Sequence, residues 1–340
     1  MTTTISLAAR DFIVVGCDSL ATTSVDLVFP HELASEFFDA AGSLKLDGNG
    51  QPLLKTSAQI WEKAKSMPVD QLPSVTKLYD LEPIRACLLF AGTSRIGDIT
   101  IQNFVESFQA HKEVKKRRSN YTIEWLSNHL KDHVMDIYEK EIKEPWARPG
   151  MQILVSGYSA KHDYPEVWKL AFTYKRDTNV FECDVLNPTP RKTFNIIFGG
   201  QYDVIQRVVL GIDESSYWSL RGRIVDALSQ FYDEMMLSAQ VIHPAIAIPK
   251  PNFWEDKYNI FRADSGGATR LSSDIGSLSE QAGIDFVRFL IDIMIKAQEF
   301  SSSIPTVGGK IHVAILTKSK PFKWLSKEAF QFENEIVPKF

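Results

Sequence analysis

The 340-residue sequence has only three cysteines, Cys17, Cys87 and Cys183. It also lacks any apolar run as long as the roughly 18 residues that indicate a membrane-spanning helix. An odd and sparse set of cysteines argues against a disulfide scaffold and favours a reducing compartment. The first residues have neither the basic start nor the uninterrupted apolar run of a signal peptide. We therefore expect a cytoplasmic protein that does not act in the membrane.

Neither sign of charge is in excess, since 38 Lys and Arg residues face 42 Asp and Glu residues for a net charge of -4. A chain without a basic excess has no general electrostatic attraction for nucleic acid or for anionic membranes. Apolar residues make up 44% of the sequence and charged residues 24%, values that are typical of globular proteins and exclude disordered and collagen-like chains. The length suits one large domain or two ordinary ones.

Hydrophobic patterning predicts strands and helices in separate runs rather than in strict alternation. The predicted strands are 3–8, 12–17, 74–81, 84–91, 151–158, 165–173, 178–185, 193–198 and 310–317. The predicted helices are 57–66, 96–116, 121–142, 201–211, 215–239 and 279–300. This order disfavours an alternating Rossmann-type sheet and favours a layered α+β fold. Segments 23–72 and 212–280 interrupt the pattern, and we interpret both as insertions.

The N-terminus carries a candidate nucleophile. Thr2 follows Met1, and removal of Met1 would leave a free α-amine on Thr2. A threonine hydroxyl is a poor nucleophile alone, but a neighbouring α-amine can accept its proton. The ordinary pKa of this amine, about 7.7–8.0, leaves a useful fraction neutral near pH 7. Asp18 ends the apolar run 12–17, which we expect to be a strand buried on both faces, and a charge placed there needs a partner.

An ordered set of motifs resembles the proteasome β subunits and the bacterial HslV peptidase, which are N-terminal nucleophile (Ntn) hydrolases. The motifs, in order, are Thr2-Thr3-Thr4-Ile5, Asp18 sixteen residues after Thr2, Val75-Thr76-Lys77-Leu78-Tyr79, Leu88-Leu89-Phe90-Ala91-Gly92 before Gly97-Asp98, the strand at 152–157, and Gly308-Gly309 before the final strand. The resemblance covers roughly 1–22, 73–211 and 280–318. No single motif is specific, and the resemblance depends on their order.

The resemblance implies a fold, a reaction and a set of roles. The fold would be a four-layer αββα sandwich in one domain, 1–318, with the two insertions and a tail at 319–340. Thr2 would be the nucleophile of a peptidase, Lys77 the cation beside its hydroxyl, Asp18 the partner of Lys77, and the Gly92 N–H the oxyanion donor. It also implies peptide or unfolded-protein substrates and a homo-oligomer such as a ring. Whether an ATPase unfoldase is a partner lies beyond the sequence. No cofactor and no metal are expected.

The sequence also departs from the family. Gly200 stands where the family usually has a serine, the segment 300–307 lacks the usual acidic residue, and Leu20 replaces a common arginine. Two alternatives therefore stay open. One is a catalytically silent subunit or scaffold, and the other is an Ntn amidase or peptide transferase with a specialised substrate.

Two further clusters are better explained without a ligand. His129 and His133 are four residues apart in a predicted helix, but no glutamate follows the first histidine as the metalloprotease motif requires. We interpret them as part of a solvated helix face. The basic run Lys115-Lys116-Arg117-Arg118 is interpreted as the end of a helix rather than as a phosphate site.

Overall fold

The computed structural model describes residues 2–53, 60, 65–72, 75–187, 189, 194–211, 214–242, 249–254, 275–301, 304–320 and 322–326. The chain divides into two compact units, which are treated separately below. The larger unit comprises Met1–Gln201 and Gly276–Phe340, and the smaller comprises Tyr202–Ile275.

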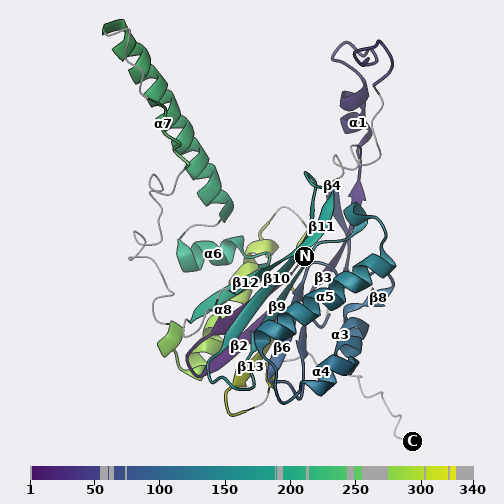
Figure 1. Cartoon of the computed structure of the whole chain (residues 1–340), viewed down its shortest axis with the longest axis vertical. Helices are drawn as coiled ribbons and strands as arrows, with labels where there is room; N and C mark the ends of the chain where they lie inside the picture. Colours follow the sequence, from purple (N-terminus) through teal and green to yellow (C-terminus); the bar gives the residue numbers. More distant parts are fainter. Residues whose placement is uncertain are drawn as a thin grey trace, which may run out of the picture. The chain divides into compact units, whose positions relative to one another are not determined.

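Two five-stranded antiparallel sheets form the larger unit (Figure 1). The first sheet has the order β12-β1-β2-β13-β14 and the second the order β11-β10-β9-β6-β5. The strands of the first sheet are β1 (Thr3–Ala8), β2 (Phe12–Asp18), β12 (Asn195–Gly200), β13 (Ile311–Thr317) and β14 (Lys323–Ser326). Those of the second are β5 (Leu78–Asp80), β6 (Ala86–Ala91), β9 (Met151–Gly157), β10 (Glu166–Lys175) and β11 (Val180–Leu186).

A shared apolar core joins the two sheets. Ile13 and Val15 of the first sheet belong to the same buried cluster as Leu89 and Leu154 of the second. On its other side the first sheet packs against α8 (Glu280–Glu299). Every residue of β2 is therefore buried, and the prediction of a strand covered on both faces is confirmed.

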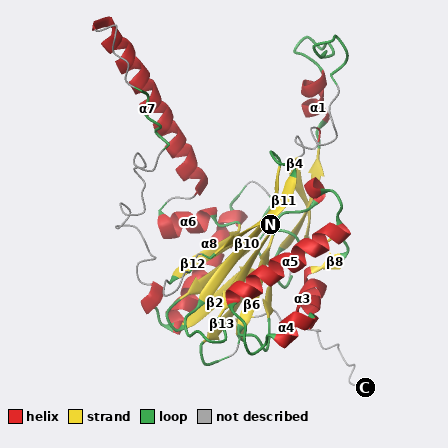
Figure 2. Cartoon of the chain, viewed as in Figure 1, coloured by secondary structure: helices red, strands yellow, loops and turns green. Residues whose placement is uncertain are grey.

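Helices α3 (Ile101–Ala110) and α5 (Ile123–Glu141) cover the other side of the second sheet (Figure 2). Phe104 and Phe108 of α3 and Leu130 of α5 are buried there against strand residues such as Phe90. Elements from distant parts of the sequence therefore meet in one unit. The active-site candidates lie in or directly next to β1, β2, β5 and β6, which are strands of both sheets.

The predicted helix at 96–116 is wrong in its start and its continuity. Residues 95–100 form the short hairpin of β7 (Arg95–Ile96) and β8 (Ile99–Thr100), with Gly97 at a φ of +56° in the turn. The Thr100 side chain then accepts a hydrogen bond from the Asn103 N–H and starts α3 as an N-cap. His111 has extended ψ, so a separate helix α4 (Lys112–Lys116) follows.

The first predicted insertion contains regular structure that the sequence pattern did not indicate. Strand β3 (Ala21–Leu27) pairs with β4 (Lys65–Leu72), and α1 (Pro30–Phe37) lies between them in the chain. Most of the predicted helix at 57–66 lies outside the described residues, and its last two residues belong to β4. In the tail, β14 adds an edge strand to the first sheet.

The smaller unit contains α6 (Asp203–Leu210) and the 29-residue α7 (Glu214–Ile242). The segment 249–254 packs on α7, where Arg221 donates to the Trp254 carbonyl at 2.5 Å and Lys250 pairs with Asp233 at 2.7 Å. Two short 3₁₀ helices are also present. Pro145–Ala147 belongs to the larger unit, and Ile275–Ser277 lies where the chain passes from the smaller unit to the larger. Among the described residues, no helix is long and apolar enough to cross a membrane.

Candidate active site

The hairpin of β1 and β2 brings Thr2 next to Asp18. The two strands pair in register from Thr4 opposite Cys17 to Ala8 opposite Ile13, so the start of β1 lies beside the end of β2. The Thr2 hydroxyl donates a hydrogen bond to Asp18 Oδ1. Three of the four predicted site residues thus meet, because Lys77, just before β5 in the other sheet, donates from Nζ to the Thr2 hydroxyl oxygen.

Asp18 is a fully buried carboxylate whose oxygens are well supplied with donors. Oδ1 accepts from the Thr3 N–H at 2.9 Å and from Lys77 Nζ at 3.0 Å. Oδ2 accepts from the N–H groups of Leu20 at 3.2 Å and Gly308 at 3.1 Å. A buried charge is tolerated only when it is paired and hydrogen-bonded. Asp18 therefore fixes the position of the groups around it.

Lys77 directs its ammonium at the same point. Its Nζ contacts the Thr2 hydroxyl, the Asp18 carboxylate and the Leu20 carbonyl, which together account for its three N–H donors. The residue is 7% exposed. A cation held against a hydroxyl oxygen favours the developing alkoxide. This geometry provides the charge that a threonine nucleophile needs.

Gly200 lies against the backbone of Thr2 and has no room for a side chain. Its φ is +76°, and a Cβ at this position would lie 1.9 Å from the Thr2 carbonyl oxygen. The next residue holds Thr2 in place, since the Gln201 N–H donates to that carbonyl at 2.7 Å. The Thr3 hydroxyl in turn donates to the Gln201 carbonyl at 2.6 Å. Glycine at 200 thus follows from the close backbone approach.

Gln201 and Thr306 are site residues that sequence reasoning missed. The Thr306 hydroxyl donates to Gln201 Oε1 at 2.6 Å, and the Thr306 N–H donates to Gln298 Oε1 at 3.2 Å. Thr306 is buried, and Gly308 two residues later donates to Asp18. The segment 300–307 therefore supplies a hydroxyl instead of an acid. Only the short sequence distance from Gly308 could have pointed to Thr306.

Gly92 follows the last residue of β6 and lies near the same group. A Cβ on Gly200 would lie 3.2 Å from the Ala91 Cβ, so the end of β6 adjoins Gly200 and Thr2. Gly92 has a φ of +111°, and a Cβ there would lie 2.5 Å from the Gly150 carbonyl oxygen. The position therefore requires glycine. Its role as an oxyanion donor stays a prediction.

Cys17 adjoins Asp18 but does not compete as a nucleophile. Burial raises the pKa of its thiol to about 12, although the nearby positive charge of Lys77 acts to lower it. Only the thiolate is strongly nucleophilic. The thiol therefore stays protonated near pH 7 and serves as packing.

The other candidate clusters lie outside this group. His129 contacts His111 through ring nitrogens 3.1 Å apart, and burial together with His111 lowers the pKa of both His129 and His133. In the described part of the chain, no three His, Cys, Asp or Glu side chains are grouped to hold a metal ion. Arg117 stacks on Trp125, 4.8 Å from the ring centre, which gives part of the basic run a packing role.

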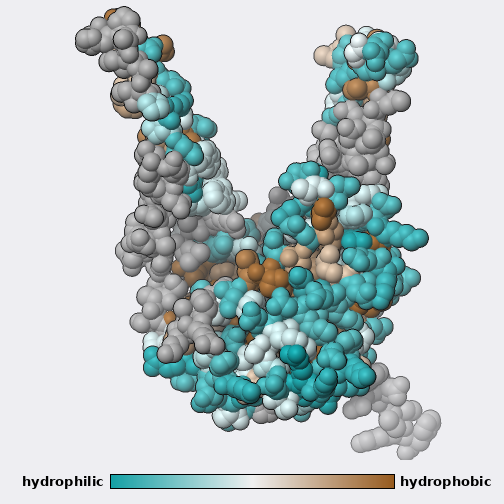
Figure 3. Space-filling model, in the orientation of Figure 1, coloured by the Kyte–Doolittle hydropathy of each residue, from teal (hydrophilic) through white to brown (hydrophobic). Residues whose placement is uncertain are grey.

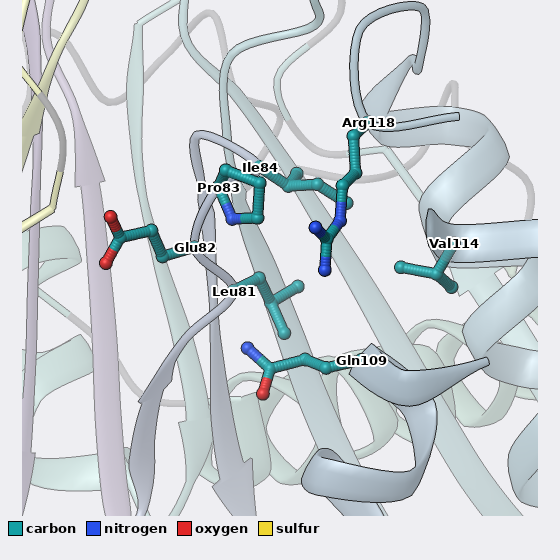
Figure 4. Close-up of a pocket in the computed structure, with 7 residues that line it drawn as sticks. All are labelled: Leu81, Glu82, Pro83, Ile84, Gln109, Val114 and Arg118. Atoms are coloured by element: carbon teal, nitrogen blue, oxygen red, sulfur yellow. The ribbon is translucent and has the colours of Figure 1, made fainter. Parts of the chain in front are cut away.

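A small surface pocket lies between the β5–β6 turn and the helices α3 and α4, and contains none of the four predicted site residues (Figure 4). Its lining residues are Leu81, Glu82, Pro83, Ile84, Gln109, Val114 and Arg118. Arg118 and Gln109 extend toward the turn that carries Pro83 (Figure 4). The pocket is separate from the Thr2 group and does not define a substrate site for it.

The chain matches no protein-family model and no curated protein. Among solved structures it is similar to the Anbu (Gly-1) mutant from Hyphomicrobium sp. strain MC1. That similarity has a TM-score of 0.44 and 9% sequence identity, and covers 98% of this chain and 91% of the other.

Proposed function

We propose that this protein is an N-terminal threonine hydrolase that cleaves amide bonds, with peptides as its substrates. The observation that carries the proposal is the buried contact of the Thr2 hydroxyl with both Asp18 and Lys77. Lys77 and Asp18 contact each other directly at 3.0 Å, and their ion pair alone does not need a hydroxyl that contacts both charges. The hydroxyl here belongs to the residue that becomes the N-terminus when Met1 is removed.

In the proposed reaction, the free α-amine of Thr2 accepts the hydroxyl proton while Oγ1 attacks the substrate carbonyl carbon. Lys77 stabilises the negative charge that develops on Oγ1, and the Gly92 N–H holds the oxyanion. The protonated amine then gives its proton to the leaving nitrogen as the C–N bond breaks. Water, deprotonated by the same amine, attacks the resulting Thr2 ester, releases the acid and restores the hydroxyl.

The hydrogen bonds around Thr2 support this assignment of roles. The Gln201 N–H holds the Thr2 carbonyl, and the Asp18 carboxylate holds the Thr3 N–H and Lys77 Nζ. The nucleophile is therefore fixed on both sides by groups from distant elements. Such preorganisation is what catalysis by electrostatics and orientation requires.

We also propose the layer architecture that the resemblance implies. The two facing sheets with their outer helices suit a four-layer αββα sandwich. A homo-oligomer, such as a ring, stays a prediction from the sequence, which leaves open whether an ATPase unfoldase is a partner. A cytoplasmic location also stays a prediction from the sequence.

A catalytically silent subunit is the second candidate, and two observations favour it. Thr2 is only 3% exposed, and the family's serine and acidic residue are replaced here by Gly200 and Thr306. A retained Met1 would support this alternative, because Thr2 would then lack a free amine. An amidase or transferase would keep the same nucleophile and differ only in its substrate or acceptor.

The first experiment is the intact mass of the purified protein before and after treatment with a peptide epoxyketone or β-lactone. Loss of Met1 and one adduct mapped to Thr2 are expected. Thr2→Ala should abolish both the adduct and peptidase activity, whereas Thr2→Ser should keep part of the activity because it keeps the hydroxyl. Thr173→Ala, in an exposed part of β10, is the matched control. Full activity of Thr2→Ala would refute the mechanism.

A further inference from the structure

A two-stranded arm begins and ends beside the Thr2 site. The arm consists of β3 (Ala21–Leu27), β4 (Lys65–Leu72) and the chain between them, which includes α1. Strand β3 starts directly after Leu20, whose N–H donates to Asp18 and whose carbonyl accepts from Lys77 Nζ. Strand β4 ends shortly before Lys77. Both strands of the arm are therefore connected to residues of the site.

The arm has little part in the buried core. None of its described residues belongs to the apolar cluster between the two sheets or to the cluster beneath α3 and α5. Leu44 and Leu46 are 45% and 57% exposed. Both hydrophilic and hydrophobic residues are visible on the end of the arm that carries α1 (Figure 3). A role in the core therefore does not account for the contacts that the arm makes beside Thr2.

The arm is hydrogen-bonded to the peptide group between Pro305 and Thr306. Thr22 and Gln71 pair across the two strands. Both side chains donate to the Pro305 carbonyl, Gln71 Nε2 at 2.6 Å and Thr22 Oγ1 at 3.5 Å. The N–H of the same peptide group belongs to Thr306 and donates to Gln298 Oε1 of α8 at 3.2 Å. Because a peptide group is planar and rigid, the arm and α8 together fix its orientation.

This orientation determines where the Thr306 hydroxyl lies. Thr306 is 5% exposed, and its hydroxyl donates to Gln201 Oε1 at 2.6 Å. The Gln201 N–H in turn donates to the Thr2 carbonyl at 2.7 Å. Hydrogen bonds and single residues thus form a continuous path from Gln71 to Thr2, and the whole path lies in the larger unit. Loss of the first bond would free the peptide group and turn the hydroxyl away from Gln201.

We infer that Gln71 is a positioning residue for Thr2, and that the arm supports the nucleophile through Pro305, Thr306 and Gln201. The inference rests on the proposed function for its effect on rate, because only a reacting hydroxyl converts position into rate. The position itself is measurable without any activity, through the Gln201 amide that donates to Thr2.

Amide hydrogen exchange at Gln201 tests the path directly. Gln71→Glu removes the N–H donor at nearly the same size and should speed exchange of this amide about threefold or more. Thr306→Val removes the hydroxyl and should act as strongly, whereas Thr306→Ser should keep the parental rate. Gln51→Glu makes the same change at an exposed position of the arm and should have no effect. The amide of Leu154, buried in β9, should exchange equally in all variants, which controls for a loss of overall stability.

Peptide hydrolysis measures the effect on rate. Gln71→Glu and Thr306→Val should each lower kcat about fivefold, the factor expected for the loss of one neutral hydrogen bond. KM should stay nearly unchanged, because both variants act on the position of Thr2 and not on substrate binding. The double variant should be no slower than Thr306→Val alone, since Gln71 acts through Thr306. Gln51→Glu should keep the parental kcat.

Two outcomes would overturn the inference. One is unchanged exchange of the Gln201 amide in Gln71→Glu, whatever the activity. The other is an unchanged kcat beside faster exchange, or effects of Gln71→Glu and Thr306→Val that simply add. A parent protein with neither peptidase activity nor a Thr2 adduct would refute the proposed function instead. The exchange rate at Gln201 would then still decide whether the arm supports Thr2.

Discussion

The Gly200→Ser variant tests two opposite expectations for this position. The resembled family usually has a serine here, whereas this structure has no room for a side chain. If the family pattern alone decided this position, serine would improve the site. The structure predicts the opposite, because a Cβ on residue 200 would lie 1.9 Å from the Thr2 carbonyl oxygen. A Cβ atom essentially never lies closer than 3.0 Å to such an atom, so the Thr2 backbone would have to move by about 1.1 Å.

The expected cost of Gly200→Ser has two parts. The φ of +76° lies in the left-handed region, which costs a residue with a side chain about 1–2 kcal/mol. Moving Thr2 also breaks the bond from the Gln201 N–H to its carbonyl, which contributes about 1 kcal/mol. The free energy of unfolding should therefore fall by about 2–3 kcal/mol. A displacement of about 1 Å at the nucleophile should lower peptidase activity about 100-fold.

Denaturant unfolding and peptide hydrolysis measure the two effects. Gly48→Ser is the matched control, since nothing lies within 4 Å of a Cβ there and its φ is not positive. It should change the unfolding free energy by less than about 0.5 kcal/mol. If Gly200→Ser keeps both the stability and the activity of the parent, the reasoning from the close contact with Thr2 is wrong.

Three further predictions concern charged and thiol groups. Lys77→Met leaves a buried carboxylate without its cation, so it should cost about 3–5 kcal/mol in denaturant unfolding and abolish peptidase activity; parental stability would contradict the pairing. Burial, with a smaller contribution from Glu82, raises the pKa of Asp80 from 3.8 to about 6. The folded state therefore loses stability as pH rises from 3.8 through 6, because the buried carboxylate must ionise. Asp80→Asn removes this loss. After allowance for the partial exposure of Asp80, the variant should raise the unfolding free energy by about 1 kcal/mol at pH 8 and by nearly nothing at pH 3. Burial raises the pKa of Cys87 well above 9.0, as it raises that of Cys17, so both thiols should resist iodoacetamide at pH 8 until the protein is unfolded, as mass spectrometry can check.

Part of the fold was predictable from local pattern. The continuous apolar run at 12–17 predicted a strand covered on both faces, and the helix at 121–142 followed from its periodicity. These features depend on neighbouring residues, whose spacing determines which side chains share a face. The start of α3 was missed because the Thr100 cap and the Gly97 turn act over only a few residues within an apolar stretch.

The candidate site was likewise only partly predictable from the sequence. The sequence alone determined that Thr2 and Asp18 sit at the open ends of one hairpin, because a tight turn and a two-residue side-chain period leave little choice of register. Only the tertiary structure decided that Lys77 completes the pair and that Gln201 and Thr306 support it, since these residues are brought together from 75 to about 300 positions away. Periodicity specifies the face on which a side chain lies. The partner that it meets there is chosen by packing of whole sheets and by the need to satisfy every buried charge.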